Sequence, residues 1–322
     1  MEGKGLGETN RVDHPRPEVA AYHGHVLTMN TFESLLATQR YLLADGAIGT
    51  MLFAAGLAQG TAPELWNAEE PEKVRAIHRA YIEAGSRVIL TNSFGGSRFR
   101  LKRHKLQDRV SDLNRAAAGL ARIEADEAAS PIAVGGSMGP TGELLEPMGI
   151  LRFDQARDAF AEQATALAEG SVDVFWVETM SDLQEVQAAV MGIRDVSDLP
   201  IVTTLTFDTN GRTMMGVTPV LGLEAMRELG VTALGGNCGN GPAEIEGVIQ
   251  AMHTADPNAV LVAKSNAGIP QYVDGVLAYS GTPEVMARHA MRVRDLGAKI
   301  IGGCCGTTPE HIRAMSEALA NN

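Results

Sequence analysis

From residue 41 onward, short apolar runs alternate with longer segments of helical period, and the alternation continues to the last residues. Continuous apolar runs of this kind are typical of strands buried on both faces, as in parallel sheets. We predict strands at residues 41–48, 87–92, 132–138, 172–179, 201–207, 233–238, 260–266 and 299–304. We predict helices at residues 72–84, 153–169, 182–193, 222–229, 242–252, 283–296 and 309–319.

Eight strands separated by helices match the count of a (β/α)8 TIM barrel, which belongs to the α/β class. A doubly wound sheet is the alternative, but it usually has fewer strands. No linker or change of composition interrupts the rhythm, so we predict one barrel domain at residues 35–322. Residues 1–34 are polar, with glycine, proline and histidine scattered through them, and we predict that they form a short flexible N-terminal tail.

The charge of the chain argues against several function classes. Its formal net charge is −12, whereas proteins that bind nucleic acids or anionic membrane surfaces present basic patches. We interpret the basic run at residues 98–105 as a solvated loop and helix face. No apolar stretch is long enough to span a membrane, and the N-terminus lacks the apolar core of a signal peptide. Three cysteines in 322 residues fit a reducing compartment, so we expect a cytoplasmic protein.

All three cysteines lie in glycine-flanked motifs at the ends of predicted strands. The motifs are Gly235-Gly236-Asn237-Cys238-Gly239 and Gly302-Gly303-Cys304-Cys305-Gly306. Three thiolates fill three corners of a zinc tetrahedron and leave the fourth corner open for chemistry. One alternative is a disulfide, but a bond between Cys304 and Cys305 would be strained, and the other is three buried structural cysteines. We predict a zinc site formed by Cys238, Cys304 and Cys305.

Polar side chains end most of the predicted strands. Asp45 and Glu178 follow strongly apolar runs, where an unpaired charge would be costly. A single residue of this kind is usually a helix cap or a structural hydrogen-bonding group, but two carboxylates beside a metal site indicate binding of a cation such as an ammonium group. The turn at residues 135–142, which contains Ser137, offers backbone N–H groups to a carboxylate. Together these groups suit an amino acid with a thiol, because zinc holds the nucleophilic thiolate.

Six short motifs together resemble the homocysteine S-methyltransferase family. They are Asp45-Gly46-Ala47-Ile48-Gly49-Thr50, Thr91-Asn92-Ser93-Phe94-Gly95, Gly139-Pro140-Thr141-Gly142, Val177-Glu178-Thr179-Met180 and the two cysteine motifs. The resemblance implies a (β/α)8 barrel in which the three cysteines bind zinc and homocysteine supplies the fourth ligand through its sulfur. It also implies that Asp45 and Glu178 hold the homocysteine amino group, and we place Ser137 in the same site.

Family members differ in their methyl donor, and the chain looks closest to short bacterial betaine–homocysteine methyltransferases. We therefore expect betaine, or a related quaternary ammonium or sulfonium compound, as the donor and methionine as the product. The alternatives are S-methylmethionine and methylcobalamin on a separate corrinoid protein. Aromatic side chains are expected around a quaternary ammonium, although Thr179 stands where the resemblance predicts a tyrosine. The remaining aromatic candidates are Trp66, Phe94, Phe99 and Tyr272.

Two other function classes fit the sequence less well. A zinc- or thiol-sensing binding protein has no need of an amino-acid binding pair such as Asp45 and Glu178. A thiol oxidoreductase would use a CxxC motif, which this chain lacks, and adjacent cysteines make a poor redox pair. The sequence therefore predicts a zinc-dependent methyltransferase with homocysteine and a methyl donor as its small-molecule partners, and it leaves open whether the protein forms a homo-oligomer.

Overall fold

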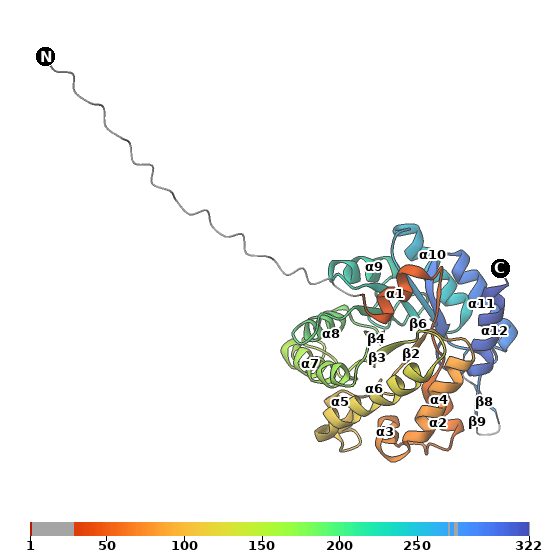
Figure 1. Ribbon diagram of the computed structural model, residues 1–322, viewed down its shortest axis with the longest axis horizontal. Coiled ribbons are helices and arrows are strands. Elements are labelled where there is room, and N and C mark those ends of the chain that lie inside the picture. Colours follow the sequence, from red (N-terminus) through yellow and green to blue (C-terminus); the bar gives the residue numbers. More distant parts are fainter. Residues whose placement is uncertain (2–28, 270, 274–275, 322) are drawn as a thin grey trace.

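The computed structural model describes residue 1 and residues 29–321, apart from residues 270, 274 and 275 and the side chains of residues 272–277. Its parallel strands form a ring surrounded by helices (Figure 1). In order around the ring, the strands are β1 (Leu42–Leu43), β10 (Ala298–Gly303), β7 (Leu261–Ser265), β6 (Ala233–Cys238), β5 (Ile201–Leu205), β4 (Val174–Met180), β3 (Ala133–Met138) and β2 (Val88–Leu90). A parallel bridge between Ala44 and Val88 joins the two ends of the ring. The predicted (β/α)8 barrel is confirmed.

Helices cover the outside of the strand ring, and many lie where the hydrophobic period predicts them. The predicted segments correspond to α4 (Pro71–Glu83), α7 (Phe153–Glu169), α8 (Leu183–Arg194), α9 (Pro219–Glu228), α10 (Pro242–Ala255), α11 (Pro283–Asp295) and α12 (Pro309–Ala320). Several begin with proline, whose missing N–H costs nothing in the first turn of a helix. The boundaries agree with the expected ones to within about three residues, which is the usual uncertainty of helix ends.

The structure also contains elements that we do not predict from the sequence. The longest is α6 (Val110–Glu127), which lies between β2 and β3. Half of its buried residues are alanines, but its helical period is at least as clear as that of α7 and α8, so the sequence carries a signal for this helix that we do not use. The others are α2 (Ile48–Ala54), α3 (Trp66–Glu69), α5 (Arg98–Lys102), the 3-10 turns η1 (Pro63–Leu65) and η2 (Gln107–Arg109), and a hairpin of β8 (Gln271–Val273) and β9 (Val276–Ala278). These elements belong to the connections between strands.

One further helix, α1 (Thr31–Thr38), closes the amino end of the barrel. Its Phe32 and Leu35 pack in the same cluster as the residues inside the ring, among them Val88 and Ile300. Asn30 caps the helix, and its side chain also donates to the backbone oxygen of Asp173, at the start of β4. Residues 31–34, which we expect to belong to the flexible tail, are therefore part of helix α1, and residues 2–28 of the predicted tail lie outside the described residues.

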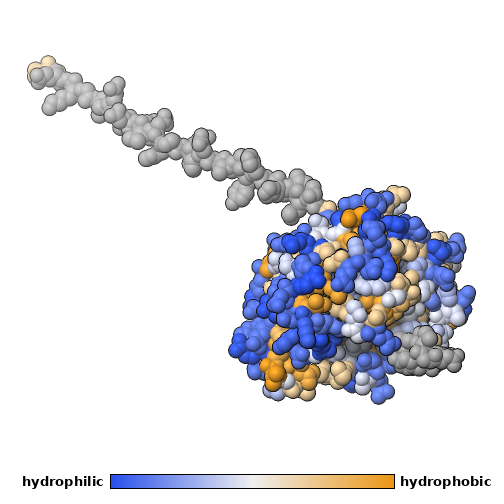
Figure 2. All heavy atoms as spheres, turned by 90° about the horizontal axis from the view of Figure 1, so that it is seen from below, coloured by the Kyte–Doolittle hydropathy of each residue, from blue (hydrophilic) through white to orange (hydrophobic). Residues whose placement is uncertain are grey.

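Hydrophilic side chains cover most of the face shown in Figure 2, with hydrophobic groups between them. No helix among the described residues is long and apolar enough to cross a membrane. A second and larger apolar cluster fills the space between the strands and the outer helices. The carboxyl ends of the strands, by contrast, open onto a cavity lined by polar side chains, which is where TIM barrels carry their active sites.

Candidate metal centre and its pocket

The three cysteines meet at the carboxyl ends of β6 and β10. The Sγ atoms of Cys238, Cys304 and Cys305 all lie within 4.8 Å of one another, and those of Cys238 and Cys304 are 3.0 Å apart. All three are free thiols, since 3.0 Å is far longer than the ~2.05 Å of a disulfide bond. No other group of three or more metal-ligating side chains in the described part of the chain is close enough to share an ion.

Backbone conformation turns these thiols toward one another. Cys238 has a φ of 59° and Gly239 a φ of 69°, both in the left-handed region that non-glycine residues rarely adopt. The Cys304 N–H donates to the Ser265 carbonyl at 2.8 Å, and Thr307 Oγ1 donates to the Cys304 carbonyl at 2.7 Å. The sequence predicts that glycines supply the backbone freedom here. At the end of β6 the cysteine itself carries the unusual backbone, a feature that clusters at functional sites.

Asn237 fixes the end of β6 against its neighbours. Its buried side chain accepts hydrogen bonds through Oδ1 from the Thr179 N–H at 2.9 Å and from Thr204 Oγ1 at 2.8 Å. Its Nδ2 donates to Thr179 Oγ1 at 2.7 Å and lies 3.4 Å from Cys238 Sγ and 3.8 Å from Cys304 Sγ. Asn237 thus ties β4, β5 and β6 together and directs an N–H toward two sulfurs. From the sequence, Asn237 is part of a cysteine motif but has no predicted role.

The cysteine cluster fits a zinc ion. With Zn–S bonds of about 2.3 Å, thiolates at tetrahedral corners lie about 3.8 Å apart, a spacing that this compact group reaches with small side-chain shifts. Hydrogen bonds to Cys304 and Cys305 raise the pKa of the Cys238 thiol well above its usual value, whereas hydrogen bonds from the other two thiols lower the pKa of Cys305 to about 3. The cluster alone therefore favours one thiolate, and a divalent cation would displace the remaining protons.

Asp45 is buried, and both of its carboxylate oxygens already have partners. Lys264 Nζ lies 2.7 Å from Oδ1, and the Leu90 N–H donates to Oδ2 at 2.7 Å. Lys264 belongs to β7, is only 2% exposed, and also donates to the Asp45 backbone oxygen at 3.2 Å. We do not single out Lys264 from the sequence, although a lysine near the carboxyl end of a predicted buried strand indicates a paired charge at the site. The Lys264 ammonium is thus already paired with Asp45, one of the two carboxylates that we expect to hold the ammonium group of the substrate.

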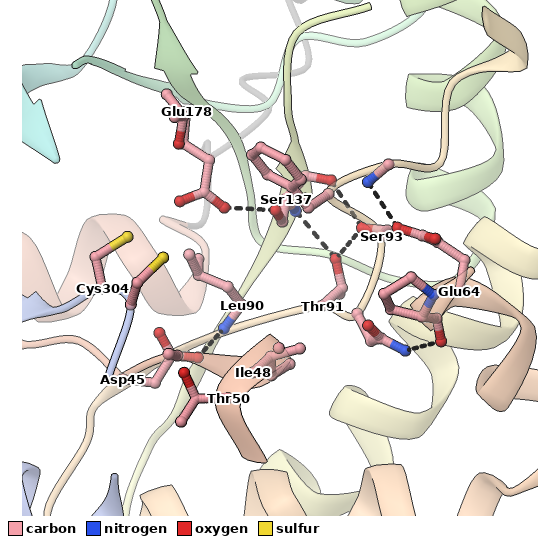
Figure 3. Close-up of a pocket in the computed structure, with 18 of the residues that line it drawn as sticks. Asp45, Ile48, Thr50, Glu64, Leu90, Thr91, Ser93, Ser137, Glu178 and Cys304 are labelled. Atoms are coloured by element: carbon pink, nitrogen blue, oxygen red, sulfur yellow. Dashed lines mark hydrogen bonds between the residues drawn. The ribbon is translucent and has the colours of Figure 1, made fainter. Parts of the chain in front are cut away.

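Glu178 has a carboxylate oxygen available. Ser137 Oγ donates to its Oε1 at 2.5 Å, and Oε2 has no hydrogen-bond partner within the described residues. Burial raises the pKa of Glu178 to about 7, although the nearby charge of Lys264 opposes this rise. Figure 3 shows Glu178, Asp45 and Cys304 around the same side of the cavity, and Ser137 beside Glu178. Asp45, Glu178 and Ser137 therefore lie together beside Cys304. Of the two carboxylates, Glu178 is the better placed to receive a cation.

Three backbone N–H groups of the turn at residues 135–142, which we expect to offer donors to a ligand carboxylate, already have partners within the protein. The Ser137 N–H donates to Thr91 Oγ1 at 3.0 Å, the Gly139 N–H to the Phe94 carbonyl at 2.9 Å, and the Thr141 N–H to Glu185 Oε1 at 2.8 Å. These donors hold the turn in place, so these three N–H groups are not available to a ligand carboxylate. Ser137 contributes through its hydroxyl group instead.

The cavity has a volume of about 460 Å³ and extends from the cysteines to a second group of polar residues. That second group comprises Glu64, Arg100, Arg103 and His104, with the ring of Phe94 also lining the cavity. In Figure 3, Glu64 and Ser93 lie across the cavity from Cys304 and Glu178. The buried Glu64 accepts a hydrogen bond from the Gly95 N–H at 2.7 Å, which holds the loop that carries Phe94. The cavity is therefore large enough, and polar enough at both ends, for two small polar molecules.

The four aromatic residues expected at the donor site are in different places. Phe94 lines the cavity, with the Arg100 guanidinium carbon 5.7 Å from its ring centre. Trp66 is buried in the core, with Lys73 Nζ 4.6 Å from its ring centre, and Phe99 packs against the same core. The Tyr272 side chain lies outside the described residues. Of the described three, only Phe94 is among the residues that line the cavity.

Tyr279 is an aromatic residue near the cysteines that the sequence analysis does not single out. Burial, followed by the charge of the Cys305 and Cys304 sulfurs, raises the pKa of its phenol to about 12. Its ring packs where a side chain at residue 306 would stand, so only glycine fits there. Tyr279 therefore covers the loop that carries Cys304 and Cys305.

A family model described as homocysteine S-methyltransferase matches residues 42–319 of the chain. Among curated proteins, the methionine synthase of Mycobacterium tuberculosis is 35% identical over 301 residues, which cover 88% of this chain and 25% of that protein. The methionine synthase of Mycobacterium leprae is 34% identical over 319 residues, covering 94% of this chain and 26% of that protein. The chain thus spans about a quarter of the length of these curated relatives.

Solved structures share the fold. The homocysteine methyltransferase MmuM from Escherichia coli, in its oxidised form, has a TM-score of 0.76 and 23% sequence identity, covering 89% of this chain and 99% of that chain. Its metallated form has a TM-score of 0.75 at the same identity and coverage. A methyltransferase from Methanosarcina mazei has a TM-score of 0.58 and 12% identity, covering 91% of this chain and 99% of that chain. At these identities the likeness concerns the barrel alone.

Proposed function

Because the chain belongs to the homocysteine S-methyltransferase family and is therefore a methyltransferase, we propose that it transfers a methyl group from betaine, or a related quaternary ammonium or sulfonium donor, to homocysteine in a zinc-dependent reaction that gives methionine. The observation that carries the proposal is the cavity in which three cysteine sulfurs face Glu178 and Ser137. A thiol cluster that can bind a metal, beside a carboxylate that keeps one oxygen available, suits an amino acid that has both a thiol and an ammonium group.

The residues around the cysteines divide the work of binding homocysteine. Cys238, Cys304 and Cys305 would hold zinc, which when bound lowers the pKa of a coordinated thiol and keeps it as the nucleophilic thiolate. Glu178 Oε2 accepts the substrate ammonium group, and Ser137 Oγ, which donates to Oε1, orients that carboxylate. Asp45 and Lys264 form a buried ion pair beside them and keep the floor of the site in place.

The chemical step is an in-line displacement. The homocysteine sulfur forms a bond to a donor methyl carbon while the carbon–nitrogen bond of betaine breaks, and the electron pair of that bond stays on nitrogen. The products are methionine and N,N-dimethylglycine, and no proton is transferred in this step. The cationic donor is activated by its own charge, so the protein has only to position it at near-attack distance from the sulfur. Phe94 presents an aromatic ring to the cavity for contact with the donor.

A second candidate donor is methylcobalamin on a separate corrinoid protein. The similarity of this chain to proteins named methionine synthase favours it, because the matched region is about a quarter of a longer protein. The step at the homocysteine end would be unchanged, and the methyl group would come from a cofactor presented at the mouth of the cavity.

A donor panel tests the proposal. The zinc-loaded protein is incubated with homocysteine and, in separate reactions, betaine, dimethylsulfoniopropionate, S-methylmethionine or a methylated corrinoid protein. We expect methionine and dimethylglycine in equal amounts with betaine. Methionine formed only with the methylated corrinoid protein would overturn the small-donor assignment in favour of the second candidate. No methionine with any donor would overturn methyl transfer to homocysteine itself.

A further inference from the structure

We propose that Arg100 binds a carboxylate group of the methyl donor, so that the donor is an onium compound that also carries a carboxylate. The proposal rests on the proposed function, since it assigns a donor class to the same cavity. It differs from the expectation that the basic run at residues 98–105 is simply a solvated face, because Arg100 is half-buried and lines the cavity.

Local structure holds Arg100 at the cavity. It lies in α5, whose first turn is capped by Ser97 Oγ accepting the Arg100 N–H at 3.4 Å. Its guanidinium carbon stands 5.7 Å from the centre of the Phe94 ring, which also lines the cavity. A guanidinium is planar, and its forked N–H donors match the two oxygens of a carboxylate. Contact with the aromatic ring restricts where this plane can lie.

The guanidinium of Arg100 has no ion-pair partner within the described residues. Two buried carboxylates, Glu64 and Glu185, attract it electrostatically, but neither forms an ion pair or a hydrogen bond with it among the described residues. Glu64 accepts from the Gly95 N–H, and Glu185 accepts from both the N–H and the hydroxyl of Thr141. Burial without a partner lowers the pKa of Arg100, with the neighbouring charge of Arg103 adding to this effect. A half-buried cation with unused donors is suited to an anionic ligand.

The charges along the cavity orient such a donor. Glu178 and the cysteine sulfurs lie at one end, and Glu64 lies across the cavity from them. Arg100 and Arg103 line the cavity, and Arg100 is close to both Glu64 and Arg103, so two guanidinium groups outnumber the one carboxylate at this arginine end. A quaternary ammonium or sulfonium would be repelled at the arginine end and attracted toward the sulfurs, where its methyl group has to be. The carboxylate of the same molecule would meet Arg100. Arg103 is less suited to this role, because it is exposed and already donates to the Gly142 carbonyl at 2.7 Å.

The test uses the full-length, zinc-loaded protein with Arg100→Met, Arg100→Lys and the matched control Lys102→Met. Methionine keeps an unbranched chain through the δ position, where the Cδ of Arg100 packs close to Gly142, while removing the charge and the N–H donors. Lys102 is an exposed cation on the same helix that does not line the cavity. Binding of N,N-dimethylglycine to the homocysteine-bound protein is measured by calorimetry. The KM values for betaine and homocysteine, and activity with choline in place of betaine, are measured in parallel.

We expect Arg100→Met to weaken dimethylglycine binding and to raise the betaine KM by about 10- to 100-fold, the usual effect of losing a charged hydrogen bond. The dimethylglycine affinity and betaine KM of Arg100→Lys should lie between those of wild type and Arg100→Met, because lysine keeps the charge but lacks the paired N–H donors of the guanidinium. Homocysteine KM and zinc content should stay unchanged, Lys102→Met should behave as wild type, and Arg100→Met should lose the preference for betaine over choline.

Three results would overturn the proposal: wild type failing to bind dimethylglycine, Arg100→Met binding it as wild type does, or Arg100→Met raising the homocysteine KM instead of the betaine KM. The same measurements distinguish a failure of this proposal from a failure of the proposed function. If wild type binds dimethylglycine through Arg100 but forms no methionine from betaine, the carboxylate site stands and the donor assignment fails. If wild type forms methionine from betaine and Arg100→Met does so equally well, the carboxylate site fails and the function stands.

Discussion

At the level of single residues, Lys264 determines which of two buried carboxylates is available to a ligand. Its ammonium occupies one oxygen of Asp45, and the backbone of Leu90 occupies the other. Among the described residues, Glu178 has only the Ser137 hydroxyl as a hydrogen-bond partner. The resemblance implies equal roles for Asp45 and Glu178 in holding an amino group. The contacts instead support direct binding by Glu178 and a positioning role for Asp45.

The two carboxylates should therefore respond differently to neutral substitutions. Glu178→Gln should raise the homocysteine KM by about 10- to 100-fold with little loss of stability, because it removes a charge-assisted hydrogen bond to the substrate. Asp45→Asn should cost about 3–5 kcal/mol of unfolding free energy, because the buried Lys264 loses the carboxylate of its ion pair. Urea denaturation and steady-state kinetics measure both effects.

A double variant checks the reason for the Asp45 effect. Asp45→Asn combined with Lys264→Met removes both charges and should recover much of the lost stability. If Asp45→Asn is fully stable and raises the homocysteine KM as much as Glu178→Gln does, then Asp45 binds the substrate directly and the division of roles is wrong.

The pH dependence of homocysteine binding should report the titration of Glu178. Its pKa is raised to about 7, chiefly by burial, so the carboxyl group is neutral below that pH and charged above it. Only the charged form attracts an ammonium group. Wild-type affinity relative to Glu178→Gln should therefore fall about tenfold for each pH unit below 7 and level off above about pH 8. The ratio removes the titration of the substrate thiol, which both proteins share, and a ratio constant from pH 5 to 8 would contradict this role of Glu178.

At the level of elements, the carboxyl ends of β4, β6, β7 and β10 bring the chemistry together, and the sequence predicts these strands well. Long apolar runs, each ended by a polar residue, make the strands and their order recognisable, and all three cysteines are at their ends. Connections are harder to predict. Half of the buried residues of α6 are alanines, which do not stand out as a hydrophobic face when a sequence is read by eye. The positions of Arg100 at the cavity and of Lys264 beside Asp45 depend on what lies next to them in space. Both are charged residues, whose usual location is the surface.

Helix α1 is an element whose role we can test apart from the active site. Phe32 is fully buried inside the amino end of the barrel, so Phe32→Ala should lower the free energy of unfolding by about 3–5 kcal/mol. The kcat of the folded protein should not change, because the cavity is at the opposite end of the strands. Phe53→Ala is the matched control, since Phe53 is 51% exposed and should cost less than about 1 kcal/mol. Thermal or urea unfolding of Phe32→Ala at wild-type stability would show that α1 does not support the barrel.

At the level of the whole molecule, the barrel separates stability from chemistry. Apolar residues fill its interior and the space under the outer helices, and α1 closes its amino end. The carboxyl end holds a cavity with sulfur and carboxylate groups on one side and arginines on the other. The net charge of −12 adds a weak attraction for a cationic donor. The account of function therefore depends on one feature, the thiol cluster as a zinc site that takes up the homocysteine sulfur.

Zinc X-ray absorption measured before and after addition of homocysteine tests this feature most directly. We predict one zinc per chain with three sulfur neighbours at about 2.3 Å and one lighter ligand, and a change to four sulfur neighbours when homocysteine binds. Cys238→Ser, Cys304→Ser and Cys305→Ser should each lose most of the zinc. A sulfur count that stays at three with saturating homocysteine, or full zinc occupancy in all three serine variants, would contradict the account.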